Sequence, residues 1–386
     1  GDPGDVGLPL QRGARGTVEK AFDGGSAVIG DVEFPKMIVI AEHEAGGGEI
    51  VGDLAELGST PAPVIRRSAT LVFGIGRHEE LPDAHMAGSV DDALAIMMAF
   101  NDARHTVAGL TVTAGNVGLE HTLANALKLV ELCGRQVPVY AGSPSPLVHP
   151  AGDASSIHGR DGFGDVGYEP AGRTAESEHA ALAILRLSHL HAGKLMLVAL
   201  GPLTNIALAL RLDPSLPERI GRLVLMGGAV TAHGNITPAA EFNIAFDPEA
   251  GHIVFNAFAR LDLVDWEATM THGLRIADVE RWLASGTGRA TFYERISHYT
   301  RRWSADSRGK LWYSADALAM AWALAPEGAL DTPERPVAVE LDGRLTRGAT
   351  VVDWNRQTGA ADNVRILARY DQARFEALVR EALETE

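Results

Sequence analysis

From Ala69 onward the chain repeats one pattern: a short apolar run of strand length, a turn, and a longer segment with the hydrophobic period of a helix. The predicted strands cover residues 71–75, 107–112, 137–140, 195–200, 223–226 and 261–264. The predicted helices between them cover residues 92–104, 121–132, 176–189 and 204–212. This alternation predicts an α/β fold with a mostly parallel, Rossmann-like sheet flanked by helices. Ligands bind beyond the carboxyl ends of the strands in such a sheet, so polar residues directly after strands are the first candidates for a site.

The two ends of the chain depart from this pattern. Towards the C-terminus we expect helices over residues 289–308 and 314–325, a hairpin from 337–341 and 349–354, and a closing helix near 371–384. Residues 1–68 have a different sequence pattern, in which Gly-rich turns near positions 24 and 47 separate short apolar runs. They form either a small β-rich appendage or a partly ordered extension. We therefore divide the chain into an N-terminal extension, 1–68, and one large domain, 69–386.

The charge balance and the single cysteine exclude several classes of function. Lys and Arg number 34 against 50 Asp and Glu, a formal net charge of -16, which disfavours nucleic acid and anionic membrane surfaces as partners. Cations and neutral polar ligands fit this balance better. Cys133 is the only cysteine, so an internal disulfide and a cysteine-based zinc site are excluded. No apolar run approaches the roughly 20 residues that span a bilayer, and we expect a soluble, cytoplasmic protein.

Two groups of polar residues follow predicted strands. Asp91 and Asp92 open the helix after the first strand, where they either cap that helix or collect a hard cation, which prefers several oxygen ligands. Asn116 follows the strand at 107–112 and is either a turn former or a ligand contact.

A third group is the most informative. Asn235, Glu241 and Asn243 place two amides and a carboxylate within nine positions, a set that suits hydrogen bonding to a polyhydroxylated ring. A solvated polar loop is the alternative. The apolar flanks and the preceding core strand favour binding.

Six segments carry a resemblance to a known family. In chain order they are Gly115-Asn116, Val137-Pro138-Val139-Tyr140-Ala141-Gly142, His158-Gly159-Arg160-Asp161-Gly162, Gly201-Pro202-Leu203-Thr204-Asn205, Met226-Gly227-Gly228 and Pro238-Ala239-Ala240-Glu241-Phe242-Asn243. Together and in this order they resemble the inosine-uridine-preferring nucleoside hydrolases. The resemblance runs from Leu71 to the C-terminus. It implies the nucleoside hydrolase fold and an N-ribohydrolase that releases ribose and a free base from ribonucleosides, with a calcium cofactor and a homodimer or homotetramer.

The resemblance also implies roles for single residues. Asp92 is similar to the metal ligand, Asp91 to the contact with the ribose 2'-hydroxyl, and Asp316 to a late aspartate that completes the protein's share of the metal shell. The backbone carbonyl of Leu200 matches a further ligand. Ribose hydroxyls would be held by Asn116, Asn235, Glu241 and Asn243, Met226 would line the pocket, and His158 and Asp161 would lie in a loop near the base.

Two positions depart from the family pattern. The family has an acidic residue upstream of the paired aspartates that binds calcium and takes a proton from the attacking water, whereas this chain has Met86 or Ala87 there. Asp83, or less favourably Glu79 or Glu80, is the candidate replacement. The family often has a histidine before the late aspartate to protonate the departing base, whereas this chain has Ala315.

These departures leave three hypotheses open. The first is a calcium-dependent nucleoside N-ribohydrolase that uses Asp83, with Tyr313 or His272 as substitutes for the missing histidine. The second is a catalytically impaired homologue that binds ribosides in a binding or regulatory role. The third is a disrupted N-terminal sequence, so that the domain lacks its first motif.

Overall fold

The computed structural model describes residues 67–76, 90–150 and 160–386, and of residues 67–76 only the backbone. The predicted N-terminal extension lies outside the described residues, except that the first strand begins at Arg67. Its β-rich character therefore stays a prediction.

The central sheet is eight-stranded within the described part of the chain, with the order β10-β13-β6-β5-β4-β1-β2-β3. Its strands are β1 (Arg67–Gly76), β2 (His105–Gly115), β3 (Val139–Ala141), β4 (Leu195–Ala199), β5 (Ile220–Met226), β6 (Leu261–Val264), β10 (Glu334–Arg335) and β13 (Val364–Ile366). All neighbours pair in parallel except β10 and β13, which are antiparallel. The predicted mostly parallel sheet is confirmed.

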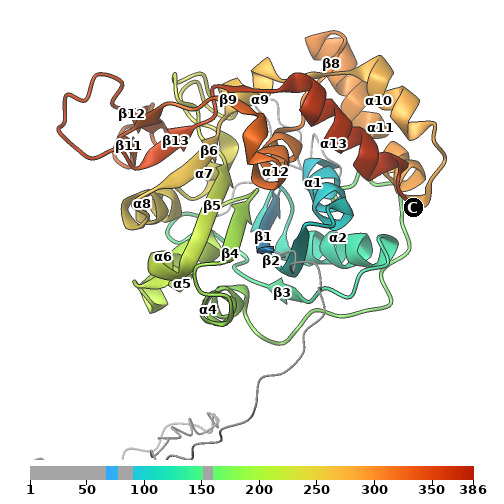
Figure 1. Cartoon of the computed structure of the whole chain (residues 1–386), viewed down its shortest axis with the longest axis horizontal. Coiled ribbons are helices and arrows are strands. Elements are labelled where there is room, and N and C mark those ends of the chain that lie inside the picture. The colour runs from blue at the N-terminus through green and yellow to red at the C-terminus, as the bar shows by residue number, and fades with distance from the viewer. Residues whose placement is uncertain (1–66, 77–89, 151–159) are drawn as a thin grey trace, which may run out of the picture. The chain divides into compact units, whose positions relative to one another are not determined.

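The helices cover both faces of this sheet (Figure 1). They are α1 (Val90–Asn101), α2 (Leu119–Leu132), α4 (Ala180–Leu190), α5 (Thr204–Leu212), α6 (Leu216–Arg219), α7 (Phe242–Phe246), α8 (Pro248–Ala257), α9 (Trp266–Thr271), α10 (Ile276–Leu283), α11 (Gly288–Arg308), α12 (Ala315–Leu324) and α13 (Gln372–Glu384), with a 3-10 turn, η1, at Pro326–Gly328. Short antiparallel pairs complete the fold: β7 (Leu274–Arg275) with β8 (Leu311–Trp312), β9 (Ala329–Asp331) with β14 (Arg369–Tyr370), and β11 (Val337–Val339) with β12 (Thr350–Val352). The last pair is the predicted hairpin.

Alternate residues of the central strands pack into two separate hydrophobic cores, one on each face of the sheet. In β4, Leu195, Leu197 and Ala199 pack with α4, α5 and α8, whereas Met196 and Val198 pack with α1, α11 and α12. Successive side chains of a strand point to opposite faces, so a strand covered on both faces is apolar throughout. This explains why β4 is an unbroken apolar run in the sequence.

Two element boundaries differ from the sequence prediction for identifiable reasons. Strand β3 begins at Val139 rather than at residue 137, because Pro138 has no N–H to donate and contributes only its carbonyl, which accepts from Leu110. Helix α4 begins at Ala180 rather than at residue 176, because the His179 ring accepts from the Ala181 N–H and caps the helix there.

The strand order positions the candidate site. The chain builds β1, β2 and β3 towards one edge and then returns to build β4, β5 and β6 on the other side of β1. The crevice at this reversal, beyond the carboxyl ends of β1 and β4, is where open α/β sheets bind ligands. In the part of the chain that the structure describes, no helix has the length and apolar character needed to cross a membrane.

Candidate active site

Two helices meet with their N-termini at the carboxyl edge of the sheet. Asp91 and Asp92 lie in the first turn of α1, and each is 1% exposed. Asp91 Oδ2 accepts a hydrogen bond of 3.1 Å from the backbone N–H of Ala315, the first residue of α12. Asp91 therefore binds the N-terminus of another helix as well as opening its own. Both helix dipoles favour negative charge at this point.

Asp316, the second residue of α12, joins this pair in a buried acidic cluster. Burial raises the pKa of Asp92 and of Asp316 well above the ordinary value, and the charges of the neighbouring aspartates raise both pKa values further. Burial raises the pKa of Asp91 to about 7, although the Ser314 hydroxyl and the Ala315 N–H oppose that shift. The carboxyl groups of the adjacent Asp91 and Asp92 thus interact electrostatically with that of Asp316, which is distant in the sequence.

The donor chemistry of this cluster fits a hard cation in part. Asp91 Oδ1 and Asp92 Oδ1 are buried and have no hydrogen-bond partner among the described residues, and carboxylate oxygens are the ligands that Ca²⁺ prefers. Within residues 67–76, 90–150 and 160–386, however, no three His, Cys, Asp or Glu side chains are grouped as a complete metal shell requires. Asp92 and Asp316 would therefore supply only part of such a shell.

The Leu200 carbonyl, which follows β4, is already engaged in one hydrogen bond. It accepts from Asn243 Nδ2 at 3.0 Å. The same amide nitrogen lies 3.2 Å from the Met226 carbonyl oxygen and 3.3 Å from the Met226 sulfur. Asn243 thus ties the carboxyl ends of β4 and β5 together. A carbonyl oxygen has two lone pairs, so that of Leu200 retains one acceptor position for a further partner.

Glu241 organises the loop that carries the amide side chains. It is fully buried and caps α7, where Oε1 accepts from the Asn243 N–H, and Oε2 accepts from the Ile244 N–H and, at 2.8 Å, from the Gly228 N–H. Burial raises the pKa of Glu241 to about 7. Asn235 Oδ1 accepts from the Phe242 N–H at 2.9 Å, so the loop predicted to grip a sugar is held by its own side chains.

At the carboxyl edge, four buried polar atoms from three segments have no hydrogen-bond partner among the described residues. They are Asp91 Oδ1, Asp92 Oδ1, Asn116 Oδ1 and Asn235 Nδ2. Buried polar atoms in native proteins are almost always hydrogen-bonded, to protein, water or ligand. Three acceptors and one donor at one edge of the sheet match a ligand with several hydroxyl groups.

An apolar wall adjoins these polar atoms. Ala114 at the end of β2, Phe242 and Phe246 of α7, and Trp266 of α9 form a small buried cluster. Phe242 and Phe246 lie with their ring centroids 5.8 Å apart. The edge therefore combines polar groups for hydroxyls with an apolar surface beside them.

Several predicted site residues cannot be placed. Asp83, Glu79, Glu80, Met86, Ala87 and His158 lie outside the described residues. Asp161 is described, and its Oδ1 accepts from the Phe163 and Asp165 N–H groups. It stabilises its own turn.

The position before the late aspartate is occupied by a buried methyl group. Ala315 is 3% exposed and contributes only its N–H. His272 does not fit as a substitute acid, because Nδ1 lies 2.8 Å from the Ala268 carbonyl oxygen and Nε2 accepts from the Tyr370 N–H at 2.9 Å. Both ring nitrogens are thus used within the core. Tyr313 is buried, and its ring lies against Gly273.

Asn205 and Asp247 contribute to the site in ways that the sequence did not reveal. Asn205 Oδ1 accepts from the Ser143 N–H at 2.9 Å, and its Nδ2 donates to the Val112 carbonyl at 3.0 Å. Asp247 Oδ2 accepts from the Thr204 hydroxyl at 2.6 Å. These bonds fasten the strand ends that carry the site.

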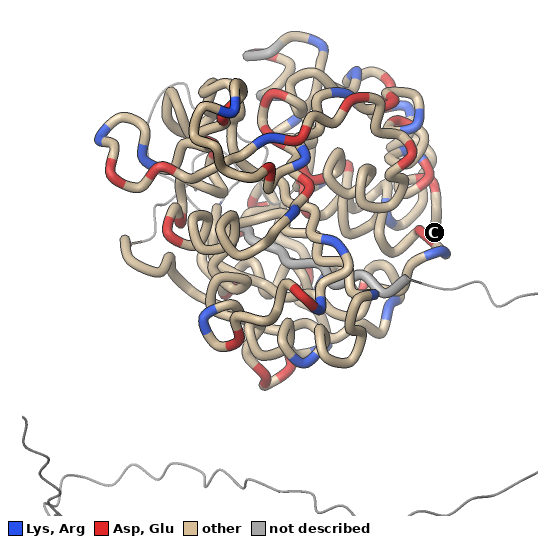
Figure 2. Tube along the Cα trace, turned by 60° about the vertical axis from the view of Figure 1, so that its left-hand side comes forward, with Lys and Arg blue, Asp and Glu red and all other residues tan. Residues whose placement is uncertain are grey.

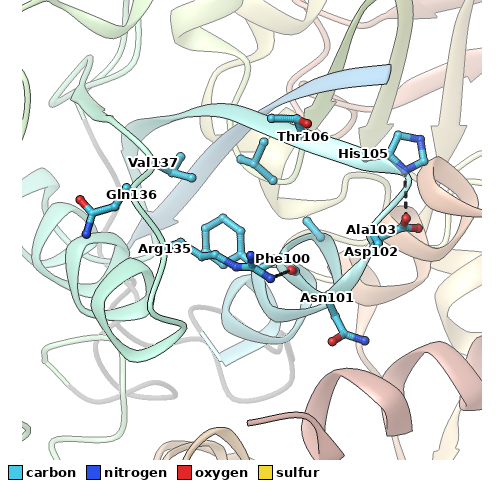
Figure 3. Close-up of a pocket in the computed structure, with 11 residues that line it drawn as sticks. Phe100, Asn101, Asp102, Ala103, His105, Thr106, Arg135, Gln136 and Val137 are labelled. Atoms are coloured by element: carbon cyan, nitrogen blue, oxygen red, sulfur yellow. Dashed lines mark hydrogen bonds and ion pairs between the residues drawn. The ribbon is translucent and has the colours of Figure 1, made fainter. Parts of the chain in front are cut away.

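A separate cavity of about 440 Å³ lies at the opposite edge of the sheet (Figure 3). It is bounded by the end of α1, the start of β2 and the Arg135–Val137 segment, where Arg135 donates to the Phe100 carbonyl and His105 faces Asp102 at 3.4 Å. It contains none of the polar residues of the carboxyl edge. We therefore do not assign it to the active site.

Comparison with known proteins identifies the family of the chain. Residues 86–377 match the family described as inosine-uridine preferring nucleoside hydrolase. The chain belongs to this family. An inosine-uridine preferring nucleoside hydrolase from Leishmania major is 37% identical over 76% of this chain and 94% of its own length. A pyrimidine-specific ribonucleoside hydrolase of Escherichia coli K12 is 34% identical over 76% of this chain and 93% of its own length.

A solved structure confirms the nucleoside hydrolase fold. An inosine-guanosine nucleoside hydrolase superposes with a TM-score of 0.75 at 31% identity, covering 83% of this chain and 99% of that chain. The names of these relatives include purine and pyrimidine nucleosides, so membership in the nucleoside hydrolase family does not fix the base.

Proposed function

We propose that this chain hydrolyses the N-glycosidic bond of ribonucleosides to ribose and a free base, with the assistance of calcium. The observation that carries the proposal is the set of buried, unpartnered polar atoms on Asp91, Asp92, Asn116 and Asn235 at the carboxyl edge of the sheet. A ribose offers hydroxyl groups that can donate to the three oxygens and accept from the amide nitrogen.

Each residue has a role in this proposal. Asp91 binds the ribose 2'-hydroxyl, Asp92 and Asp316 hold the cation together with the Leu200 carbonyl, and Asn116, Asn235, Glu241 and Asn243 hold the remaining hydroxyls. Met226 lines the pocket. Asp83 is proposed as the carboxylate that takes a proton from water, and His158 as a contact to the base.

The acidic cluster also suits the chemistry of bond cleavage. As the bond from C1' to the base nitrogen lengthens, positive charge develops on the ribose ring, and carboxylates fixed nearby stabilise that charge. A bound calcium ion would add coordination of the ribose hydroxyls and would polarise the attacking water. The apolar wall of Phe242, Phe246 and Trp266 keeps bulk water from one side of the polar atoms.

A catalytically impaired homologue that binds ribosides is the second candidate. It is favoured by Ala315, whose side chain cannot protonate a departing base, and by the absence of an acidic residue at Met86 and Ala87. Loss of the general acid alone would slow departure of the base about 100-fold or more. The two candidates share the ribose site and differ in turnover.

Calcium as the ion, a homodimer or homotetramer, a cytoplasmic location and a role in nucleoside salvage are part of the proposal. Figure 2 shows acidic and basic positions interspersed along the trace. This distribution agrees with a small neutral substrate rather than with a nucleic acid. The absence of nucleic acid binding stays a prediction.

The deciding experiment measures ribose release from inosine and from uridine by the purified full chain, with calcium and with excess chelator, beside equilibrium binding of both nucleosides. Calcium-dependent release supports the hydrolase. Asp92→Asn should then abolish the release, while Asp331→Asn, at an exposed position, leaves it unchanged. Loss of release in Asp83→Asn would support the proposed base. Binding without release supports the impaired homologue. If the protein neither releases ribose nor binds either nucleoside, both candidates are overturned.

A further inference from the structure

Helix α11 and the N-terminus of α12 carry two buried hydroxyl groups that have no hydrogen-bond partner among the described residues. Tyr293 is fully buried on α11, and its Oη has no hydrogen-bond partner among the described residues. Ser314, 2% exposed, is the residue before α12, and its Oγ is also unpartnered in the described part of the chain. An unpartnered buried hydroxyl is costly, so each one requires an explanation.

Both residues interact electrostatically with Asp91. Ser314 directly precedes Ala315, whose N–H donates to Asp91 Oδ2, and the Ser314 side chain stabilises the charged form of that carboxyl group. The Tyr293 ring packs against Trp312, with centroids 5.9 Å apart. The charges of Asp91 and Asp316 raise the pKa of Tyr293 beyond the effect of burial.

One oxygen of the Asp91 carboxylate can accept a further hydrogen bond. One carboxylate oxygen is fixed by the helix N–H, whereas Oδ1 is buried and unpartnered among the described residues. A carboxylate held at one oxygen only can rotate about its last bond, and a ribose hydroxyl would then meet a poorly oriented acceptor. The hydroxyls of Tyr293 and Ser314 are donors, Asp91 Oδ1 is an acceptor, and all three are buried.

We propose that Tyr293 and Ser314 are positioning residues, whose hydroxyls act on the Asp91 carboxylate through a bridging buried water and fix its orientation towards the ribose. The inference rests on the proposed function, since it concerns how Asp91 binds a sugar. Neither residue needs to touch the substrate. Groups of this kind behind a binding carboxylate typically change affinity or activity 10- to 100-fold when they are removed.

Tyr293→Phe and Ser314→Ala test the proposal, because each removes one hydroxyl and nearly preserves the side-chain shape. We expect kcat/KM and nucleoside affinity to fall about 10-fold or more, because the Asp91 carboxylate loses its fixed orientation. Ser314→Thr, which keeps the hydroxyl, should restore most of the loss. Kinetics equal to those of the parent protein in both hydroxyl-deleted variants would overturn the proposal.

Two variants serve as matched controls. The Tyr370 hydroxyl donates to the carbonyls of Ala321 and Ala325 at the far end of α12, and the Ser304 hydroxyl donates to the Leu311 carbonyl. Tyr370→Phe and Ser304→Ala should lower the unfolding midpoint and leave kcat and KM unchanged. A fall in kcat/KM of Tyr293→Phe that neither control shows separates positioning from a purely structural role.

A double-mutant cycle separates failure of this inference from failure of the proposed function. Unfolding of Asp91→Asn, Tyr293→Phe and the combined variant is measured in chelator, where neither substrate nor catalysis is involved. Non-additive midpoint shifts indicate that the two side chains interact. Additive shifts overturn the inference, even if the parent protein releases ribose, and non-additive shifts support it even if the parent protein is inactive.

Discussion

The asparagine side chains at the carboxyl edge of the sheet differ in whether other parts of the protein already bind them. The Asn243 side-chain amide nitrogen is used to join β4 to β5, whereas Asn116 Oδ1 has no partner among the described residues. The sequence could indicate both as ribose contacts, because both follow strands. It could not distinguish them, since the difference depends on backbone atoms of Leu200 and Met226, 43 and 17 positions from Asn243.

Cys133 provides a prediction about pH at the residue scale. It is 8% exposed, and burial raises the pKa of its thiol from 9.0 to about 11. The neutral thiol is therefore favoured in the folded protein, and at pH 8 the thiolate fraction is about 100-fold smaller than for an exposed cysteine. We expect alkylation by iodoacetamide, followed by mass spectrometry, to be about 100-fold slower in the folded protein than in urea, and to accelerate up to a pH near 11.

The unfolded chain in urea is the control for this measurement, because its single cysteine is accessible and has an ordinary pKa. Equal alkylation rates in the folded and unfolded protein would contradict the burial of Cys133 at the C-terminus of α2.

At the scale of elements, the hydrophobic period predicted β1 to β6, helices α1, α2, α4 and α5, and later α11, α12, the hairpin of β11 and β12, and α13. It did not predict that β13 joins the main sheet. Val364–Ile366 is only three residues long, and its place beside β6 depends on pairing with Leu261–Leu263, about a hundred positions away. A short strand carries too little periodicity to reveal a distant partner.

Asn205 offers a prediction at this scale, because it fastens the carboxyl ends of neighbouring strands. Its replacement by Ala leaves the Ser143 N–H and the Val112 carbonyl buried without a partner. We expect a loss of about 2–4 kcal/mol in the free energy of unfolding, measured by urea denaturation. Nucleoside affinity should weaken as well, because these strand ends carry the site.

Asn256→Ala is the matched control. The Asn256 side chain is exposed and donates only to the His252 carbonyl of its own helix, so we expect a change below about 0.5 kcal/mol. If Asn205→Ala were equally mild, the strand ends would be held by other contacts.

At the scale of the whole domain, α12 connects the two edges of the sheet. Its N-terminus contributes Asp316 to the acidic cluster, while the carbonyls of Trp322 and Ala323 near its C-terminus accept from Arg222 of β5 at the amino edge. The position of the acidic cluster thus depends on packing along the whole helix. The sequence could name Asp316 through the family resemblance, but the anchoring of the helix required the structure.

Asp262 tests whether the amino edge serves stability alone. It is 3% exposed and accepts from Arg222 of β5 and Arg365 of β13, each at 2.6 Å, and both guanidinium groups lie over the Trp322 ring, at 5.5 and 4.9 Å. Asp262→Asn removes the negative charge between two partly buried cations. We expect a loss of about 3–5 kcal/mol in the free energy of unfolding, with kcat and KM unchanged while the protein stays folded.

The exposed pair of Arg260 and Glu334 supplies the comparison, since its side chains are 57% and 44% exposed. Glu334→Gln should change the free energy of unfolding by less than about 1 kcal/mol. A drop in kcat/KM for folded Asp262→Asn would instead mean that strain at the amino edge reaches Asp316 through α12. In that case the Arg222 and Trp322 contacts would have to be counted among the groups that position the acidic cluster.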